Sequence, residues 1–198
     1  MDAEIYLAFF AVTFLFMIIP GPNVALIVAN SIAHGMRSGA FTVLGTCSAM
    51  VVQLALVGVG IAGAASLLGE WIGWIRWLGI FYLIYLGVKL WQAAAVAANS
   101  APVAGSDYAR GFMVSFVNPQ TLVFYAAFFP QFVKTDRPIA PQMLIFGATF
   151  VVLAFLIDGA WAVVIGLTRF KVFGNARLRN RVSGALLIVV AVALALAR

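Results

Sequence analysis

Two proline-centred motifs interrupt apolar stretches of the chain, and each has the residue types that can hold a small ligand. The first is Pro20-Gly21-Pro22-Asn23. Proline removes a backbone donor and glycine permits unusual backbone angles, so this motif predicts a broken helix. Pro22 suits the first position of a new half-helix, whose free N–H groups attract a carboxylate. Asn23 adds a donor and an acceptor. A kink that serves packing alone is the alternative.

The second motif, Asn118-Pro119-Gln120, repeats this pattern later in the chain. The side chain of Asn118 can bond backbone groups that the proline leaves free. Gln120 can bond a ligand or close the gap between the half-helices. An Asn-Pro pair standing alone in an apolar helix is more often a kink. Because the first motif accompanies it, we interpret both as parts of one substrate-binding site.

Asp158 is the third candidate, because it lies near the centre of an apolar run. An acid in a membrane interior costs several kcal/mol unless it faces a cavity or a partner. Burial favours its neutral, protonated form, which suits a proton-coupling residue. A structural acid bonded to backbone or hydroxyl groups is the alternative. Trp161 follows three residues later on the same helical face and is assigned either to the same cavity or to packing.

The composition shows what kind of element must carry these residues. Of 198 residues, 65% are hydrophobic and 9% are charged, whereas soluble chains have roughly 25% charged residues. Such a chain needs lipid as its solvent. The net charge of +6 does not indicate nucleic-acid binding, because the basic residues lie between the apolar runs. The single Cys47 has no disulfide or metal-ligand partners and is interpreted as a packing residue.

Six apolar runs are long enough, or nearly so, to cross a hydrocarbon core as helices of roughly 20 residues. They cover residues 5–31, 40–68, 71–98, 111–133, 143–167 and 182–197. The sequence therefore predicts an all-α integral membrane protein with six transmembrane helices and no cofactor. Helices 1 and 4 are expected to be broken near the membrane midplane.

A polar stretch at 99–107 divides this single membrane domain into two three-helix halves, 1–98 and 108–198. Because each half crosses the membrane an odd number of times, a structural repeat must have inverted topology, here 3+3. The break falls in the first helix of each half. Corresponding breaks of this kind indicate a substrate site at the midplane.

Lysine and arginine counts favour an external N-terminus, since cytoplasmic loops carry more of them. This orientation places eight of them inside and four outside. The inner set is Arg37, Lys89, Arg110, Arg169, Lys171, Arg177, Arg179 and Arg181, and the outer set is Arg76, Lys134, Arg137 and Arg198.

Several motifs, in their order and spacing over nearly the whole chain, resemble the LysE/RhtB family of amino-acid exporters. They are Pro-Gly-Pro-Asn at 20–23, His34-Gly35-Met36-Arg37-Ser38-Gly39, Gly79, Tyr82-Leu83-Ile84-Tyr85-Leu86-Gly87, Asn118-Pro119-Gln120, Phe128-Phe129-Pro130-Gln131-Phe132, Asp158 and Gly184. The resemblance implies a bacterial inner-membrane exporter driven by the proton motive force. It implies substrates such as basic amino acids, homoserine or threonine. The family usually has lysine after Asn-Pro, so Gln120 leaves this chain without that positive charge.

We therefore hypothesise an alternating-access exporter that exchanges an amino acid for protons and is not an enzyme. Half-helix N-termini would hold the substrate carboxylate, Asn23, Asn118 and Gln120 would orient it, and Asp158 would carry the proton. A passive channel is the main alternative. A metal-ion exporter is disfavoured because one acid makes a poor cage, and a membrane enzyme because no nucleophile and base are paired. An assembly subunit and a homodimer stay open.

Overall fold

The computed structural model describes residues 2–19, 21–63, 65–92, 106–134 and 136–168, together with isolated positions from 181 to 195. Every regular element in these ranges is helical. The α-helices are α1 (Ala3–Ile18), α2 (Pro22–His34), α3 (Met36–Gly63), α4 (Ala65–Gln92), α5 (Asp107–Phe116), α6 (Pro119–Phe128) and α7 (Ile139–Thr168), and a short 3-10 helix covers Phe129–Gln131. Pro20, most of the 99–107 linker and most of the sixth apolar run lie outside the described residues.

The helix boundaries follow from capping residues. Pro22 and Pro119 occupy the first turns of α2 and α6, where a missing N–H costs nothing. Ser106 caps α5, because its Oγ accepts a hydrogen bond from the Ala109 N–H at 3.3 Å. α2 ends where Gly35 adopts a φ of +85°, a conformation that favours glycine. The turn at Gly35 leads directly into α3.

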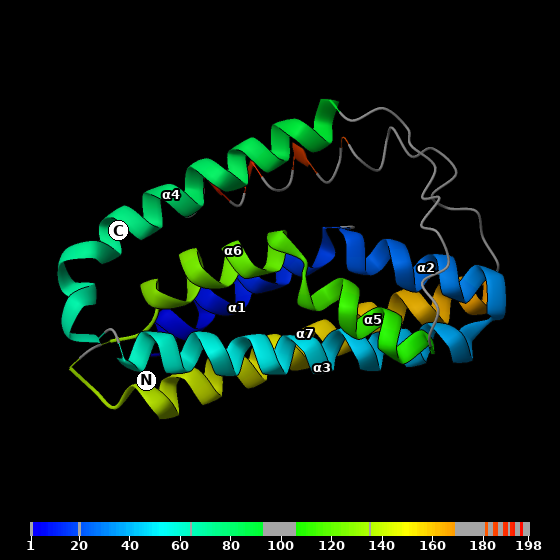
Figure 1. The fold of residues 1–198 in the computed structure, drawn as a ribbon, viewed down its shortest axis with the longest axis horizontal. Coiled ribbons are helices and arrows are strands. Elements are labelled where there is room, and N and C mark those ends of the chain that lie inside the picture. The colour runs from blue at the N-terminus through cyan, green and yellow to red at the C-terminus, as the bar shows by residue number, and fades with distance from the viewer. Residues whose placement is uncertain are drawn as a thin grey trace.

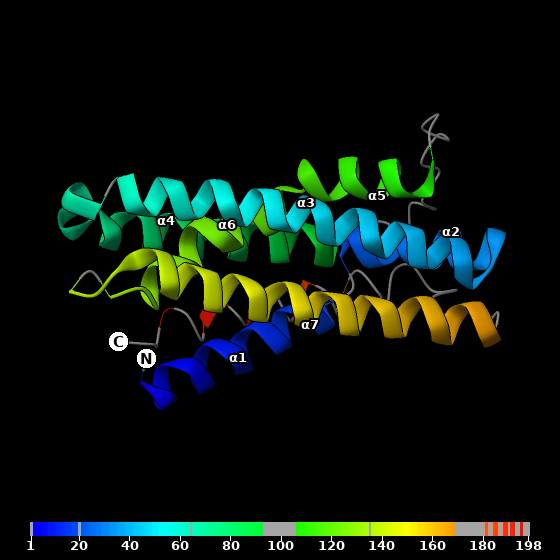
Figure 2. The same ribbon diagram turned by 90° about the horizontal axis from the view of Figure 1, so that it is seen from below.

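Two of the predicted helices are broken, as the proline motifs indicate. α1 and α2 are bent by 49° at the first motif, and α5 and α6 by 51° at the second. α3 and α7 run side by side along the long axis of the molecule (Figures 1 and 2). Within the described residues, Met36–Ile61 and Ile139–Leu167 are long and apolar enough to cross a membrane. If each of the two bent pairs is counted as one span, the number of candidate membrane spans rises from two to four.

The surface of these helices suits lipid rather than water. Many large apolar side chains point outward, including Val59 and Leu144, which are each 74% exposed. Exposed apolar surface on this scale marks an interface with membrane or protein. The all-helical, membrane-type architecture is thus confirmed. The full set of six spans in a 3+3 repeat stays a prediction, although a broken pair precedes a long helix in each half.

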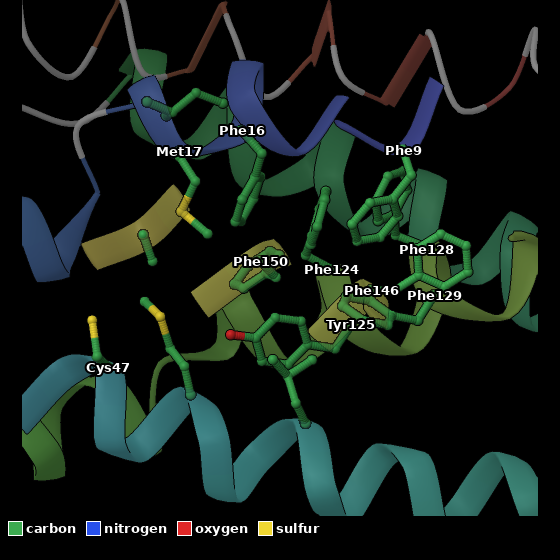
Figure 3. Close-up of a cluster of buried hydrophobic side chains, with 14 of the residues drawn as sticks. Phe9, Phe16, Met17, Cys47, Phe124, Tyr125, Phe128, Phe129, Phe146 and Phe150 are labelled. Carbon is green, nitrogen blue, oxygen red and sulfur yellow. The ribbon is translucent and has the colours of Figure 1, made fainter. Parts of the chain in front are cut away.

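Close packing brings the second broken helix against α3. A Cβ atom added at Gly111 would collide with the Thr42 carbonyl of α3, and one at Gly45 would collide with the Tyr108 carbonyl of α5. Small residues allow helices in membranes to approach this closely. An aromatic core is drawn from α1, α6, the 3-10 helix and α7 (Figure 3). Its fully buried members include Phe9, Phe124, Phe128, Phe129, Phe146 and Phe150.

An ion network ties the start of α1 to the segment before α7. The Asp2 carboxylate lies 2.6 Å from Lys134 Nζ and 3.5 Å from Arg137 Nη1. The hydrogen bond from Lys134, together with both positive charges, lowers the pKa of Asp2. At the opposite end of the molecule, Ser38 Oγ donates to Asp107 Oδ2 at 2.7 Å. The N-terminus and the segment between α6 and α7 therefore lie at one end of the molecule, and the side of the membrane on which that end lies stays a prediction.

Candidate functional site

The two helix breaks meet in the interior of the molecule. Asn118 Nδ2 donates a hydrogen bond to Asn23 Oδ1 at 3.2 Å, across 95 positions of sequence. Asn23 Nδ2 in turn donates to Ser115 Oγ, also at 3.2 Å. Both asparagines are buried. A chain of side-chain amides therefore joins the start of α2 to the end of α5 and the start of α6.

The break between α5 and α6 satisfies its own backbone. Asn118 Oδ1 accepts a hydrogen bond from the Gln120 N–H at 3.0 Å, which caps α6. Thr121 Oγ1 donates to the Asn118 carbonyl at 3.0 Å. From α3, Gln53 Nε2 donates to the carbonyls of Ser115 and Phe116, each at 3.0 Å. Inside a membrane, no bulk water is present to bond the backbone groups that a helix break frees, and these side-chain hydrogen bonds take its place.

The break between α1 and α2 is built differently. Its N-cap residue is Gly21, and no described side chain caps α2. The backbone also passes close to α6, because a Cβ atom added at Gly21 would lie 3.0 Å from Gln120 Oε1. The N-terminal turn of α2 thus keeps N–H groups and a partial positive charge directed at its surroundings.

A small cavity of about 30 Å³ lies between the two breaks. Its wall combines neutral polar side chains, apolar side chains and one acid. The lining residues are Phe16, Met17, Ile19, Gly21, Asn23, Val24, Met50, Asn118, Gln120, Thr121 and Asp158. This space suits a water molecule, whereas an amino acid needs more. The structure therefore corresponds to a closed form of the site.

Among the described residues of the cavity wall, Asp158 supplies the only ionisable side chain. It comes from the middle of α7 and is 3% exposed. In this part of the chain no lysine or arginine lines the cavity, and no cation forms an ion pair with Asp158. An unpaired buried carboxylate is costly, so this carboxyl group needs a proton or a cationic ligand.

The structure brings most of the predicted site residues together. Gly21, Asn23, Asn118, Gln120 and Asp158 all line the cavity. Pro22 and Pro119 begin the two half-helices beside it, and Pro20 lies outside the described residues. Trp161 does not line this cavity. It packs against a neighbouring apolar cluster of Val24, Val28 and Ile165.

Three polar residues at the helix breaks were not identified as site residues from the sequence. Gln53, Ser115 and Thr121 are buried and make hydrogen bonds at the breaks. Gln53 carried a usable signal, because it is a lone amide within the apolar run 40–68. Ser115 and Thr121 carried none, since hydroxyl side chains commonly bond their own helix.

The chemistry of the cavity wall suits a small molecule that has both an ammonium and a carboxylate group, although the cavity must widen to admit one. Asp158 offers a negative partner for the ammonium group, and the open N-terminus of α2 offers a positive partner for the carboxylate. The amides of Asn23, Asn118 and Gln120 supply donors and acceptors between these poles. Within the described residues, the cavity wall holds no paired nucleophile and base.

Comparison with known proteins also indicates membrane transport of small molecules. The family model described as LysE type translocator matches residues 6–198. Homoserine/homoserine lactone efflux proteins of Salmonella typhi and Salmonella typhimurium are each 30% identical over all of this chain and 99% of their own length. An uncharacterized membrane protein of Vibrio cholerae is 28% identical over the full length of both chains. No solved structure matches.

Proposed function

Because the chain belongs to the LysE type translocator family, we propose that it exports small amino acids or related metabolites of the homoserine class, driven by the proton motive force. The relatives named for homoserine and homoserine lactone efflux support this substrate class. The observation that carries the proposal is the hydrogen bond between Asn23 and Asn118, which closes two helix breaks around a cavity that contains Asp158.

The charges of the cavity wall favour substrates that carry an amine. Because the described residues of the wall include one acid and no lysine or arginine, Asp158 is the group that binds a substrate ammonium. The α-carboxylate of an amino acid lies at the N-terminus of α2. In a lactone, a neutral ester group occupies the same position. Both forms of homoserine therefore fit the same charge pattern.

The transport step follows from the closed cavity. The substrate enters when the bent pairs α1–α2 and α5–α6 separate toward one side of the membrane, and it leaves when they separate toward the other. Proton binding at Asp158 changes the relative stability of these states, because a ligand shifts an equilibrium only through its differential affinity. Since proton and ammonium compete for one carboxylate, proton entry releases the substrate.

The setting of this cycle is the bacterial inner membrane. The N-terminus lies outside, which puts Asp2, Lys134 and Arg137 at the external surface and leaves Arg37 and Arg110 on the cytoplasmic side, as the positive-inside rule favours. Lipid, protons and the amino-acid substrate are the partners of the chain, and the glycine-rich helix faces leave a homodimer as a further arrangement.

Efflux from proteoliposomes tests the proposal. Vesicles that contain the purified full-length chain are loaded with labelled homoserine, homoserine lactone, threonine or lysine, and efflux is measured with and without an imposed pH gradient. We expect saturable efflux of the homoserine compounds that accelerates with the gradient. Asp158→Asn should remove the dependence on the gradient, whereas Asp107→Asn, at the end of the molecule, should keep it.

Two results would contradict the proposal. Efflux that does not saturate and ignores the gradient would indicate a passive channel. An unchanged rate and pH dependence in Asp158→Asn would show that the proton is carried elsewhere.

A further inference from the structure

The Tyr125 hydroxyl is a buried polar group that the closed site does not use. Tyr125 lies on α6 and is completely buried, and its hydroxyl has no hydrogen-bond partner among the described residues. Leaving a buried hydroxyl unpaired destabilises a structure by about 1–3 kcal/mol. A phenylalanine would fill this position without that cost. The hydroxyl therefore calls for a partner in another state of the protein.

The ring of Tyr125 is held in one orientation by its aromatic neighbours. It packs edge-on against Phe150 at 5.0 Å and against Phe129 at 5.7 Å between ring centroids. Figure 3 shows the hydroxyl pointing away from these rings, toward the side where Met17 and Cys47 lie. The direction of the hydroxyl is thus fixed by packing and aims toward the cavity side of the core.

The acid on the cavity side of the core is Asp158, which lines the same cavity as Met17. Among the described residues, Tyr125 on α6 and Cys47 on α3 are the titratable side chains whose electrostatic environment includes Asp158. The residues that α1, α2 and the break between them contribute to the cavity wall are Phe16, Met17, Ile19, Gly21, Asn23 and Val24, and none of them titrates.

Two methionines, Met17 and Met50, belong both to the cavity wall and to the core around Tyr125. Methionine side chains are unbranched and change conformation easily. Because they are flexible, a rearrangement of these two side chains can open a path from the Tyr125 hydroxyl to the cavity that Asp158 lines.

We propose that the Tyr125 hydroxyl is a positioning group that donates a hydrogen bond to the Asp158 carboxylate once the proton and the substrate have left it. The inference rests on the proposed function, in which Asp158 alternates between proton and substrate. In that cycle the empty, charged carboxylate lies in a membrane interior and needs a donor. Tyr125 supplies this donor, and the methionines close again when Asp158 is neutral.

Infrared titration of the Asp158 carboxyl group tests this inference without a substrate. The C=O band of the protonated acid is followed against pH in proteoliposomes, and its absence in Asp158→Asn assigns it. A donor to the charged form favours loss of the proton. Tyr125→Phe should therefore move the midpoint upward by about one pH unit. The efflux rate against pH should shift in the same direction.

A matched control separates this role from packing. Tyr6→Phe also removes one hydroxyl, but that hydroxyl bonds Thr149 Oγ1 at 3.1 Å, at the α1 end that lies far from the breaks. We expect Tyr6→Phe to leave the midpoint unchanged and to lower the unfolding temperature slightly. Tyr125→Phe should keep or raise the unfolding temperature, since it removes an unpaired buried hydroxyl.

The outcomes separate the two proposals. A folded Tyr125→Phe protein with an unchanged infrared midpoint would overturn the inference about Tyr125, whatever the efflux assay shows. Gradient-dependent efflux that persists in Asp158→Asn would overturn the proposed function and this inference with it. An Asp158→Asn/Tyr125→Phe double variant that matches Asp158→Asn in its pH profile would support the inference, because the two residues then act as one unit.

Discussion

The break between α5 and α6 caps its own helix, whereas the break between α1 and α2 leaves the N-terminus of α2 open to the cavity. In the first case Asn118, Thr121 and Gln53 satisfy the freed backbone groups. In the second, Gly21 caps α2 without a side chain. We therefore propose that the second proline motif is a rigid support and the first a binding element, although both have the same kind of sequence.

The largest effect on stability is expected from a substitution that weakens the break between α5 and α6. Gln53→Leu leaves the buried carbonyl of Ser115 and the partly buried carbonyl of Phe116 without this donor. We expect it to lower the free energy of unfolding by about 2–4 kcal/mol, measured by thermal or denaturant unfolding in detergent. Ser48→Ala on the same helix removes an exposed hydroxyl that bonds its own turn and should change little. Equal losses in both variants would contradict the supporting role of Gln53.

A pair of asparagine variants separates support from binding. Asn118→Ala removes the α6 cap and the bond to Asn23, so it should cost about 2 kcal/mol of stability. Asn23→Ala removes only the bonds to Asn118 and Ser115 and should cost less, yet raise the substrate concentration for half-maximal efflux more. Unfolding and efflux measured on both proteins would decide the matter. The reverse order in the two assays would show that the assignments are exchanged.

A smaller change tests the open N-terminus directly. Gly21→Ala places a methyl group 3.0 Å from Gln120 Oε1. Because that atom ends a flexible side chain, stability should fall by less than about 1 kcal/mol. The methyl group narrows the cavity, so the efflux rate should fall several-fold. Gly60→Ala, where an added Cβ meets nothing within 4 Å, is the control, and an equal loss of efflux in the control would break the argument.

The smallest effect is expected far from both breaks. Asp2→Asn removes the ion pairs with Lys134 and Arg137 at the surface. Since these partners lower the pKa of Asp2, the stabilisation is present above the ordinary pKa of an aspartate and is lost as the pH falls through the lowered value. Wild type and variant should therefore differ slightly in unfolding temperature at neutral pH and converge in strong acid. A difference that grows in acid would contradict the assignment.

The sequence predicted which residues form the site better than it predicted the hydrogen bonds that hold them in place. Proline and glycine disturb a helix wherever they stand, and an acid in an apolar run demands a reason, so both breaks and Asp158 could be identified. The different capping of the two breaks could not, because it depends on Gln53 reaching from α3 and on Asn118 turning back to Gln120. Such contacts are set by tertiary packing.

The positions of the Trp161 and Tyr125 side chains also depend on tertiary packing and could not be predicted from the sequence. Helical spacing from Asp158 left Trp161 either lining the cavity or packing, and in the structure it packs against Val24, Val28 and Ile165. Tyr125 reads in sequence as one more aromatic residue of a hydrophobic helix. Only the packing of Phe129 and Phe150 around its ring reveals where the hydroxyl points.

The hydrogen bond between Asn23 and Asn118 also has a consequence for biosynthesis. The ribosome makes Asn23 before its partner, with 95 positions between them, which corresponds to roughly 5–20 seconds of translation. During that interval the Asn23 side chain lacks both of its hydrogen-bond partners, Ser115 and Asn118, and a buried polar group without a partner costs about 1–3 kcal/mol. The polar contacts of the first break are therefore completed only when the later segment has been made. Membrane insertion and folding of the two halves are thus coupled in time.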